Sequence, residues 1–219
     1  SSITSVSGTT PLCIGATTTY TANAVVLSGG TGAWSSSDIL VATVNPTTGL
    51  VTAVGAGTCN IIFTITGGCN GPVSAQQSLT VNPNSAITSV TGSSPLCIGA
   101  TATYTANGVV LGGGTGAWSS SDILVATVNS ASGLVTAVGA GTCNIIFTIT
   151  GGCGGTVSAQ QSLPVDPTSP ITPVSGTTPL CIGATTTYTA NGVVLSGGTG
   201  AWSSSDILVA TVNPATGLV

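Results

Sequence analysis

The sequence predicts an all-β protein built from tandem β-sandwich domains, and three observations lead to this fold class. The chain repeats itself with a period of 84 residues. Stretches within each copy alternate between apolar and polar residues, with the period of two that is typical of a half-buried strand. Turn-forming Gly, Asn and Pro residues separate these stretches about every 8–12 residues, which gives about seven short strands per copy.

The repeat sets the expected domain boundaries. Residues 3–86 and 87–170 differ at 15 of 84 positions, and the third copy, residues 171–219, has 49 residues. A period of this length is too long for one coil of a solenoid and suits a small β-sandwich domain. We therefore expect domains at 1–86 and 87–170, and an incomplete domain at 171–219 that lacks its last strands.

Two strands stand out by their alternation. In ATTTYTA, the residues Ala16, Thr18, Tyr20 and Ala22 share one face, and the Thr residues between them share the other. The second copy has Ala in place of Thr18, which suits an inward position. TCNIIFTIT alternates in the same way, and its expected inward positions are Cys59, Ile61, Phe63 and Ile65.

The segment Asn45–Gly49 lies between VATV and LVTAV and is expected to form a tight hairpin, with Gly where a positive φ is needed. The string WSSSDILVATVN leads into it and occurs three times. Its Trp is expected in the core of a central strand, at Trp34, Trp118 and Trp202. Its Asp is expected to accept backbone N–H bonds in a structural turn, at Asp38, Asp122 and Asp206.

The order TxTYTA, WSSSDxxVATVN and GLVTAVGAGTCNIIFTIT resembles the bacterial Ig-like domain, group 2 (BIG2), over nearly the whole copy. The resemblance implies tandem Ig-like β-sandwiches in an extracellular protein of the bacterial cell surface, adhesin-like or fibre-forming, and it implies no activity. PLCIGAT and GTCNIIFTITGGC are similar to repeats in very large secreted surface proteins of gliding and filamentous bacteria. Three cysteines per copy depart from the family's usual cysteine-free pattern.

The cysteines are expected to form disulfides, because no C-x-x-C and no His suggests a zinc site. Cys59 and Cys69 bracket one strand and would lie about 33 Å apart along it. A bridge needs Cα atoms within about 7 Å, which disfavours that pair. Cys13 and Cys59 are both expected at turns at the same end of the domain. We therefore predict the bonds Cys13–Cys59 and Cys97–Cys143, each stabilising its domain by roughly 4 kcal/mol in the chain-entropy model.

The third cysteine of each copy, Cys69 or Cys153, falls in the loop before the last strand, at the opposite end of the domain. That end would face the preceding domain of a tandem array. An odd cysteine in a secreted protein suggests a bond to another domain or another chain, and a buried free thiol is the alternative. Cys181 is an inter-domain or inter-chain candidate as well, because its partner segment is absent from the third copy.

Composition excludes several classes of function. The chain has no Lys, Arg or His and only four acidic residues, so it lacks the cations that bind nucleic acid or an acidic membrane surface. Its apolar runs are far shorter than the ~20 residues of a spanning helix, so no membrane insertion is expected. The opening SSITSVSGTT has no basic or apolar signal region, which suggests either that a signal was removed or that this is an internal piece.

Catalysis is not expected either. A Ser or Cys nucleophile needs a base, usually His, and none exists. Glycoside cleavage needs two carboxylates about 5 to 9.5 Å apart, whereas equivalent Asp residues here lie 84 positions apart. One Asp per copy is too few for calcium unless carbonyl groups supply the other ligands. We expect no enzyme activity, no metal and no cofactor.

The sequence favours a structural role. Sheets commonly protect their edges with Lys, which this chain lacks, so we expect the edges to be covered by neighbouring copies in a fibre or bundle. The incomplete third copy suggests a longer array, or a domain completed by a strand from another subunit. The predicted function is a repeat segment of an extracellular bacterial filament or surface fibre that self-associates, with disulfides. The alternative is an adhesin stalk or a glycan- or surface-binding module.

Overall fold

The computed structural model describes residues 1–69, 71–169 and 171–219, and these residues form strands and loops without any helix. The first copy contains nine short strands, whereas the sequence predicts about seven. These strands are β1 (Ser5–Ser7), β2 (Leu12–Cys13), β3 (Thr17–Thr19), β4 (Thr21–Asn23), β5 (Thr31–Ser36), β6 (Ala42–Val44), β7 (Leu50–Ala53), β8 (Gly57–Thr66) and β9 (Val73–Asn82).

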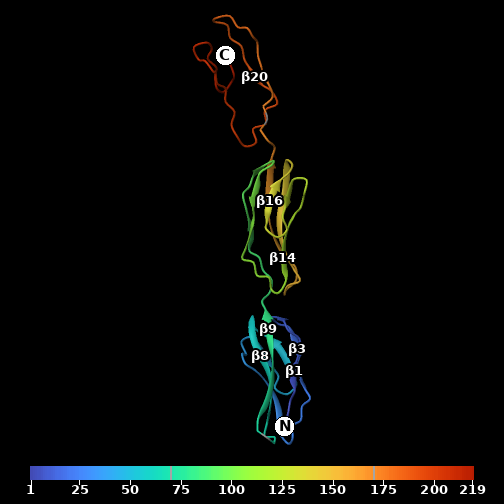
Figure 1. Ribbon diagram of the computed structural model, residues 1–219. Coiled ribbons are helices and arrows are strands. Elements are labelled where there is room, and N and C mark those ends of the chain that lie inside the picture. Colours follow the sequence, from blue (N-terminus) through green and yellow to red (C-terminus); the bar gives the residue numbers. More distant parts are fainter. Residues whose placement is uncertain (70, 170) are drawn as a thin grey trace. The chain divides into compact units, whose positions relative to one another are not determined.

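The strands of the first copy form three sheets. A four-stranded sheet has the order β2-β9-β8-β5, a three-stranded sheet has the order β3-β7-β6, and β1 pairs with β4. The long antiparallel pair of β8 and β9 is visible in Figure 1, and it aligns Cys59 with Leu79 and Phe63 with Ala75. The short strand β2 runs parallel to β9, and this pairing places Cys13 opposite Asn82.

The second copy repeats this arrangement, with sheets β11-β18-β17-β14, β12-β16-β15 and β10-β13. Each of these sheets joins segments of one copy only. The strands are β10 (Ser89–Thr91), β11 (Leu96–Cys97), β12 (Thr101–Thr103), β13 (Thr105–Asn107), β14 (Thr115–Ser120), β15 (Ala126–Val128), β16 (Leu134–Ala137), β17 (Gly141–Thr150) and β18 (Val157–Asp166).

The stretch ATTTYTA alternates as predicted, but it is divided between two sheets at Tyr20. β3 pairs with β7, and β4 pairs with β1. Tyr20 between them is only 2% exposed, and its N–H donates to the carbonyl of Gly49 at 2.9 Å. The residue therefore stays in the core while the chain passes from one sheet to the other, which accounts for part of the higher strand number.

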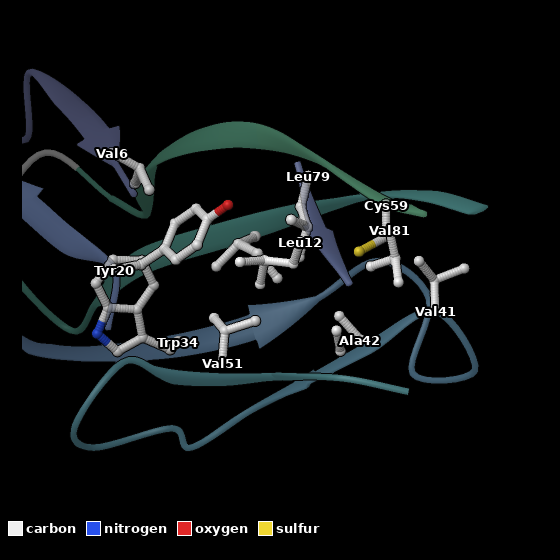
Figure 2. Close-up of a cluster of buried hydrophobic side chains, with 12 residues drawn as sticks. Val6, Leu12, Tyr20, Trp34, Val41, Ala42, Val51, Cys59, Leu79 and Val81 are labelled. Carbon is white, nitrogen blue, oxygen red and sulfur yellow. The ribbon is translucent and has the colours of Figure 1, made fainter. Parts of the chain in front are cut away.

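The core lies between the four-stranded and three-stranded sheets, where the inward residues of both meet. Figure 2 shows Tyr20 and Trp34 at one end of this core and Cys59 and Val81 at the other, with Val51 and Leu79 between them. Trp34 is 7% exposed, and its ring meets that of Phe63 edge-on with centroids 5.0 Å apart. The predicted inward set of β8 is confirmed, because Cys59, Ile61 and Ile65 are buried and Phe63 is half-buried.

The predicted hairpin is present between β6 and β7, which pair antiparallel. Asn45 Oδ1 accepts hydrogen bonds from the N–H groups of Thr47 and Thr48, both at 3.0 Å. Gly49 has φ +71°, and a Cβ there would lie 2.7 Å from the carbonyl oxygen of Tyr20. Glycine is therefore required by both the conformation and the close approach of the neighbouring chain.

The third copy extends to the position equivalent to Val51 and contains two short strands, β19 (Val174–Ser175) and β20 (Thr189–Ala190), which pair antiparallel. Trp202 is half-buried. Its backbone N–H donates to the Pro214 carbonyl at 3.0 Å, as the backbone N–H of Trp34 does to the Pro46 carbonyl. A cavity of about 490 Å³ lies beside Tyr188 and Trp202. The expected boundary at residue 170 lies outside the described residues.

Candidate functional site

A disulfide links the first two copies of the repeat. Cys13 and Cys153 are bonded at an S–S distance of 2.06 Å, their Cα atoms are 5.4 Å apart, and 140 positions separate them in the sequence. Cys13 lies in β2, an edge strand of the four-stranded sheet. Cys153 lies in the loop between β17 and β18. The third cysteine of the second copy thus bonds to the first cysteine of the copy before it.

This bond corrects the expected pairing of Cys13 with Cys59 and of Cys97 with Cys143. Cys59 and Cys143 are free thiols that are each 3% exposed. They do not lie at turns, as the sequence analysis expected, but within β8 and β17, where their side chains belong to the inward set of the strand. Leu12 pairs with Val81 and both are buried, so the next residue, Cys13, faces the other side of the sheet from the inward Cys59.

Three cysteines are both free and exposed: Cys69, Cys97 and Cys181. Cys69 is the counterpart of Cys153, and Cys97 and Cys181 are counterparts of Cys13. Cys153 itself is only 5% exposed. Cys153 is bonded to a cysteine of the other copy, whereas Cys69 and Cys181 have no bonded partner among the described cysteines.

Hydrogen bonds connect the loop that contains Cys153 with the end of the first copy and with the segment at Leu111 and Gly112. The N–H of Ser85 donates to the Cys153 carbonyl at 2.7 Å, and its hydroxyl donates to the Leu111 carbonyl at 3.0 Å. The N–H of Cys153 donates to the Gly112 carbonyl at 3.0 Å. Residues 1–90 form one compact unit together with 106–117 and 147–159, so these contacts and the disulfide lie inside that unit. Residues 91–105, 118–146 and 160–219 form the other unit.

Glycines let the linking segment approach this loop closely. A Cβ on Gly112 would lie 2.7 Å from the carbonyl oxygen of Pro83, and a Cβ on Gly113 would lie 2.4 Å from Asn82 Nδ2. Gly112 stands where the first copy has Ser28. The site therefore consists of a disulfide and a set of close backbone contacts.

The recurring Asp forms the turn that the sequence predicts. Oδ1 of Asp38 accepts a hydrogen bond from the N–H of Leu40 at 2.9 Å, and Asp122 and Asp206 do the same for Leu124 and Leu208. These three carboxylates are exposed. Among residues 1–69, 71–169 and 171–219, no group of three His, Cys, Asp or Glu side chains could hold a metal ion.

Two tyrosines in the cores have perturbed acidity. Burial raises the pKa of Tyr20 above its ordinary value of 10.0, and the neighbouring Cys59 thiol adds a smaller effect in the same direction. Tyr104 has a raised pKa for the same two reasons, with Cys143 as its neighbour. Both phenols donate hydrogen bonds to backbone carbonyls inside their own copies.

The comparisons with known proteins agree with this architecture. Residues 2–69 match the family model of the bacterial Ig-like domain (group 2). No curated protein matches the chain. In the part of the chain that the structure describes, no helix is long and apolar enough to cross a membrane.

Several solved Ig-like surface proteins are similar to the chain. Domains 4 and 5 of the S-layer protein SbsC are 17% identical, with a TM-score of 0.34, over 75% of this chain and 99% of theirs. A fragment of intimin, solved with the intimin-binding domain of the translocated intimin receptor, is 18% identical, with a TM-score of 0.42, over 78% of this chain and 66% of its own. Human protocadherin-24 EC1-2 is 13% identical, with a TM-score of 0.40, over 76% of this chain and 100% of its own. Similarities at this level carry no argument about a ligand or a function.

The chain spans only part of some of these proteins. It covers 26% of a longer SbsC fragment that contains domains 1–6.

Proposed function

Residues 2–69 belong to the family of bacterial Ig-like domains, group 2, and from this premise we propose that the chain is a structural repeat segment of an extracellular bacterial filament or surface fibre. The single observation that carries the proposal is the disulfide between Cys13 and Cys153. A bond of this kind joins one repeat to the next in addition to the polypeptide itself. A load on the array then passes through two covalent connections instead of one.

The composition of the sheet edges supports lateral association. The strand β5 is an edge of the four-stranded sheet, and its outward positions Thr31, Ala33 and Ser35 are small and uncharged. β14 repeats the same edge in the second copy. Natural edge strands are commonly protected by Lys or Pro, and this edge has neither. Pairing of these edges between neighbouring chains would bury no charge, and it would use positions on either side of Trp34, whose backbone N–H already donates to the Pro46 carbonyl at 3.0 Å.

A glycan-binding module is less well supported. Sugar-binding surfaces commonly rely on exposed aromatic rings with a polar rim. In the first two copies, Trp34, Trp118, Tyr20 and Tyr104 are buried in the cores. An adhesin stalk is the alternative function, in which the same series of domains carries a binding domain elsewhere. Neither function includes catalysis.

Electron microscopy of the oxidised chain at high concentration tests the proposal. We expect filaments or bundles, and we expect fewer of them when Ser35→Lys and Ser119→Lys place a charge on both β5 and β14. The matched control is Thr47→Lys with Ala131→Lys, which adds the same charge at exposed hairpin positions away from the edges. A monodisperse monomer at high concentration would contradict the fibre and leave the stalk.

On cells, gold-labelled antibodies against the chain locate the protein. Labelling along extended surface filaments is the expected result. Labelling confined to the base of a structure that ends in another domain would favour the stalk instead.

A further inference from the structure

The loop of the first copy that contains Cys69 has the same hydrogen bond as the loop that contains Cys153. The Ser1 nitrogen donates to the Cys69 carbonyl at 2.9 Å, and the N–H of Ser85 donates to the Cys153 carbonyl at 2.7 Å. Ser1 and Ser85 are equivalent positions of the repeat. We call the surface formed by Ser1, Gly68 and Cys69 the acceptor face. Its geometry matches that of a face that already holds a cysteine of another copy.

The opposite end of the second copy matches the end that carries Cys13. Cys97 is aligned with Asp166 in the parallel pair of β11 and β18, as Cys13 is aligned with Asn82 in β2 and β9. The N–H of the next residue, Ile98, donates to the Asp166 carbonyl at 3.0 Å, which matches the bond from Ile14 to Asn82 at 3.3 Å. We call a strand end of this kind the donor end.

The bonded pair of cysteines and its counterparts differ in one respect. Cys13 and Cys153 are bonded, and Cys153 is 5% exposed, whereas Cys69 and Cys97 are exposed free thiols. Cys181, the third cysteine of the Cys13 type, is exposed and free as well. Cys69 and the cysteines of the Cys13 type therefore have the local geometry of the bonded pair, but they form no disulfide in this structure.

We propose that the acceptor face is a docking surface for the donor end of a second copy of this chain, and that a disulfide from Cys69 to a cysteine of the Cys13 type closes it. The proposal rests on the structural role proposed above, and it names the partner and the bond. The proposed bond would have the same two kinds of cysteine as the Cys13–Cys153 bond, but it would join repeats of different chains. The bond has a direction, from a strand end to a loop.

The covalent step is a two-electron oxidation of two thiols. A small-molecule disulfide serves as the oxidant: one cysteine thiolate attacks it, releases one thiol and forms a mixed disulfide. The thiolate of the second cysteine then attacks the sulfur of the first cysteine in the mixed disulfide and releases the remaining small-molecule thiol. One protein disulfide forms, and the small disulfide is reduced to two thiols that take up the two protons.

Because the proposed bond joins a loop cysteine to a strand-end cysteine, two variants that each keep one kind of exposed cysteine can test it. The acceptor variant, Cys97→Ser with Cys181→Ser, keeps Cys69 as its exposed thiol. The donor variant, Cys69→Ser, keeps Cys97 and Cys181. Both retain the Cys13–Cys153 bond and the buried Cys59 and Cys143, so the changes fall on exposed positions and leave the cores intact. Circular dichroism before mixing checks that each variant is folded.

Each variant is incubated with oxidised glutathione, alone and mixed, and resolved on a non-reducing gel. We expect each variant alone to stay at the mass of one chain, and the mixture to give a band of twice that mass that disappears on reduction. The acceptor variant is ¹⁵N-labelled so that mass spectrometry identifies a heterodimer. Since the chain has no Lys or Arg, chymotrypsin replaces trypsin in mapping Cys69 to Cys97 or Cys181.

Two results would overturn the inference: a mixture with no more dimer than the separate variants, or an acceptor variant that dimerises with itself as fast as with the donor. Fibre formation is measured in parallel on the unchanged chain and on the donor variant. Fibres that form in both, together with no heterodimer, would reject this joint and leave the structural role standing. A heterodimer together with no fibres from the unchanged chain would keep the joint and reject the filament.

Discussion

The phenol hydroxyl of Tyr20 donates a hydrogen bond to the carbonyl oxygen of Thr9 at 3.2 Å, and Tyr104 makes the same bond to Ser93 at 2.9 Å. Each bond ties the segment between the first two strands of a copy to the core residue at which the chain changes sheets. We expect Tyr20→Phe to lower the free energy of unfolding of the first copy by about 1 kcal/mol, because the Thr9 carbonyl loses its donor. Denaturant unfolding measures the change. An unchanged midpoint would mean that water replaces the hydroxyl at no cost.

The same two phenols make stability depend on alkaline pH. Burial, and secondarily the adjacent thiol, raises the pKa of Tyr20 and Tyr104 in the folded chain above the ordinary value of 10.0. The unfolded chain therefore releases these protons first, and the stability is complete below pH 10 and falls as pH rises above it. We expect this fall to be shallower in Tyr20→Phe with Tyr104→Phe. The variant retains every thiol, so the difference between the two unfolding curves isolates the tyrosines.

A glycine makes room for the Tyr20 ring. A Cβ on Gly8 would lie 2.4 Å from the ring carbon Cδ2, and the ring itself is 2% exposed. We expect Gly8→Ala to destabilise the first copy by about 1–3 kcal/mol, since the buried ring has no space to move. The control is a double-mutant cycle: in a Tyr20→Leu background the cost of Gly8→Ala should shrink. Equal costs in both backgrounds would assign the effect to the backbone and not to the ring.

The faces of the strands could be predicted from sequence, because burial on one side of a sheet imposes a period of two. The inward set of β8 is an example, from Cys59 to Ile65. The division of ATTTYTA between two sheets could not be predicted in this way. Its alternation continues without a break through Tyr20, since an inward residue stays inward when the chain passes to the facing sheet. A pattern of burial says which face is covered and not which sheet the strand joins.

The disulfide was missed for a related reason. The sequence pattern predicts the first and third cysteines at opposite ends of a domain, so in a tandem array the third cysteine of one copy can approach the first cysteine of the copy before it. The predicted pairing instead joins Cys13 to a cysteine of its own copy. The alternation of TCNIIFTIT held a signal against that choice, because it assigns Cys59 to the inward set, and the structure has Cys59 in the core. Only three-dimensional proximity then identifies Cys153 as the partner.

The recurring Asp is expected to act through its geometry and not through its charge. Asp38 is exposed, and Oδ1 accepts the N–H of Leu40 at 2.9 Å. Asp38→Ala removes this acceptor, and we expect a loss of about 0.5–1 kcal/mol in the free energy of unfolding. Asp38→Asn keeps an oxygen at the same place and should be close to neutral, because Asn forms the same turn. Thermal unfolding of the two variants compares them, and an equal loss in both would show that the charge matters.

Counting thiols discriminates between the two disulfide patterns. Five of the seven cysteines are free in the structure, and three of these five are exposed. We expect a maleimide to label three thiols quickly in the native chain, at Cys69, Cys97 and Cys181. In denaturant without reductant the number should rise to five, because the buried thiols of Cys59 and Cys143 become accessible, and after reduction it should reach seven.

The pattern expected from sequence gives a different count. The bonds Cys13–Cys59 and Cys97–Cys143 would leave only Cys69, Cys153 and Cys181 for labelling, and denaturant would not increase their number. A count that stays at three on unfolding would therefore remove the joint between the first two repeats. The proposed docking of a second copy through Cys69 would then lose the bond on which it is built. A rise from three to five would instead require that both core cysteines are thiols, and mapping of the labelled peptides would identify Cys13 and Cys153 as the protected pair.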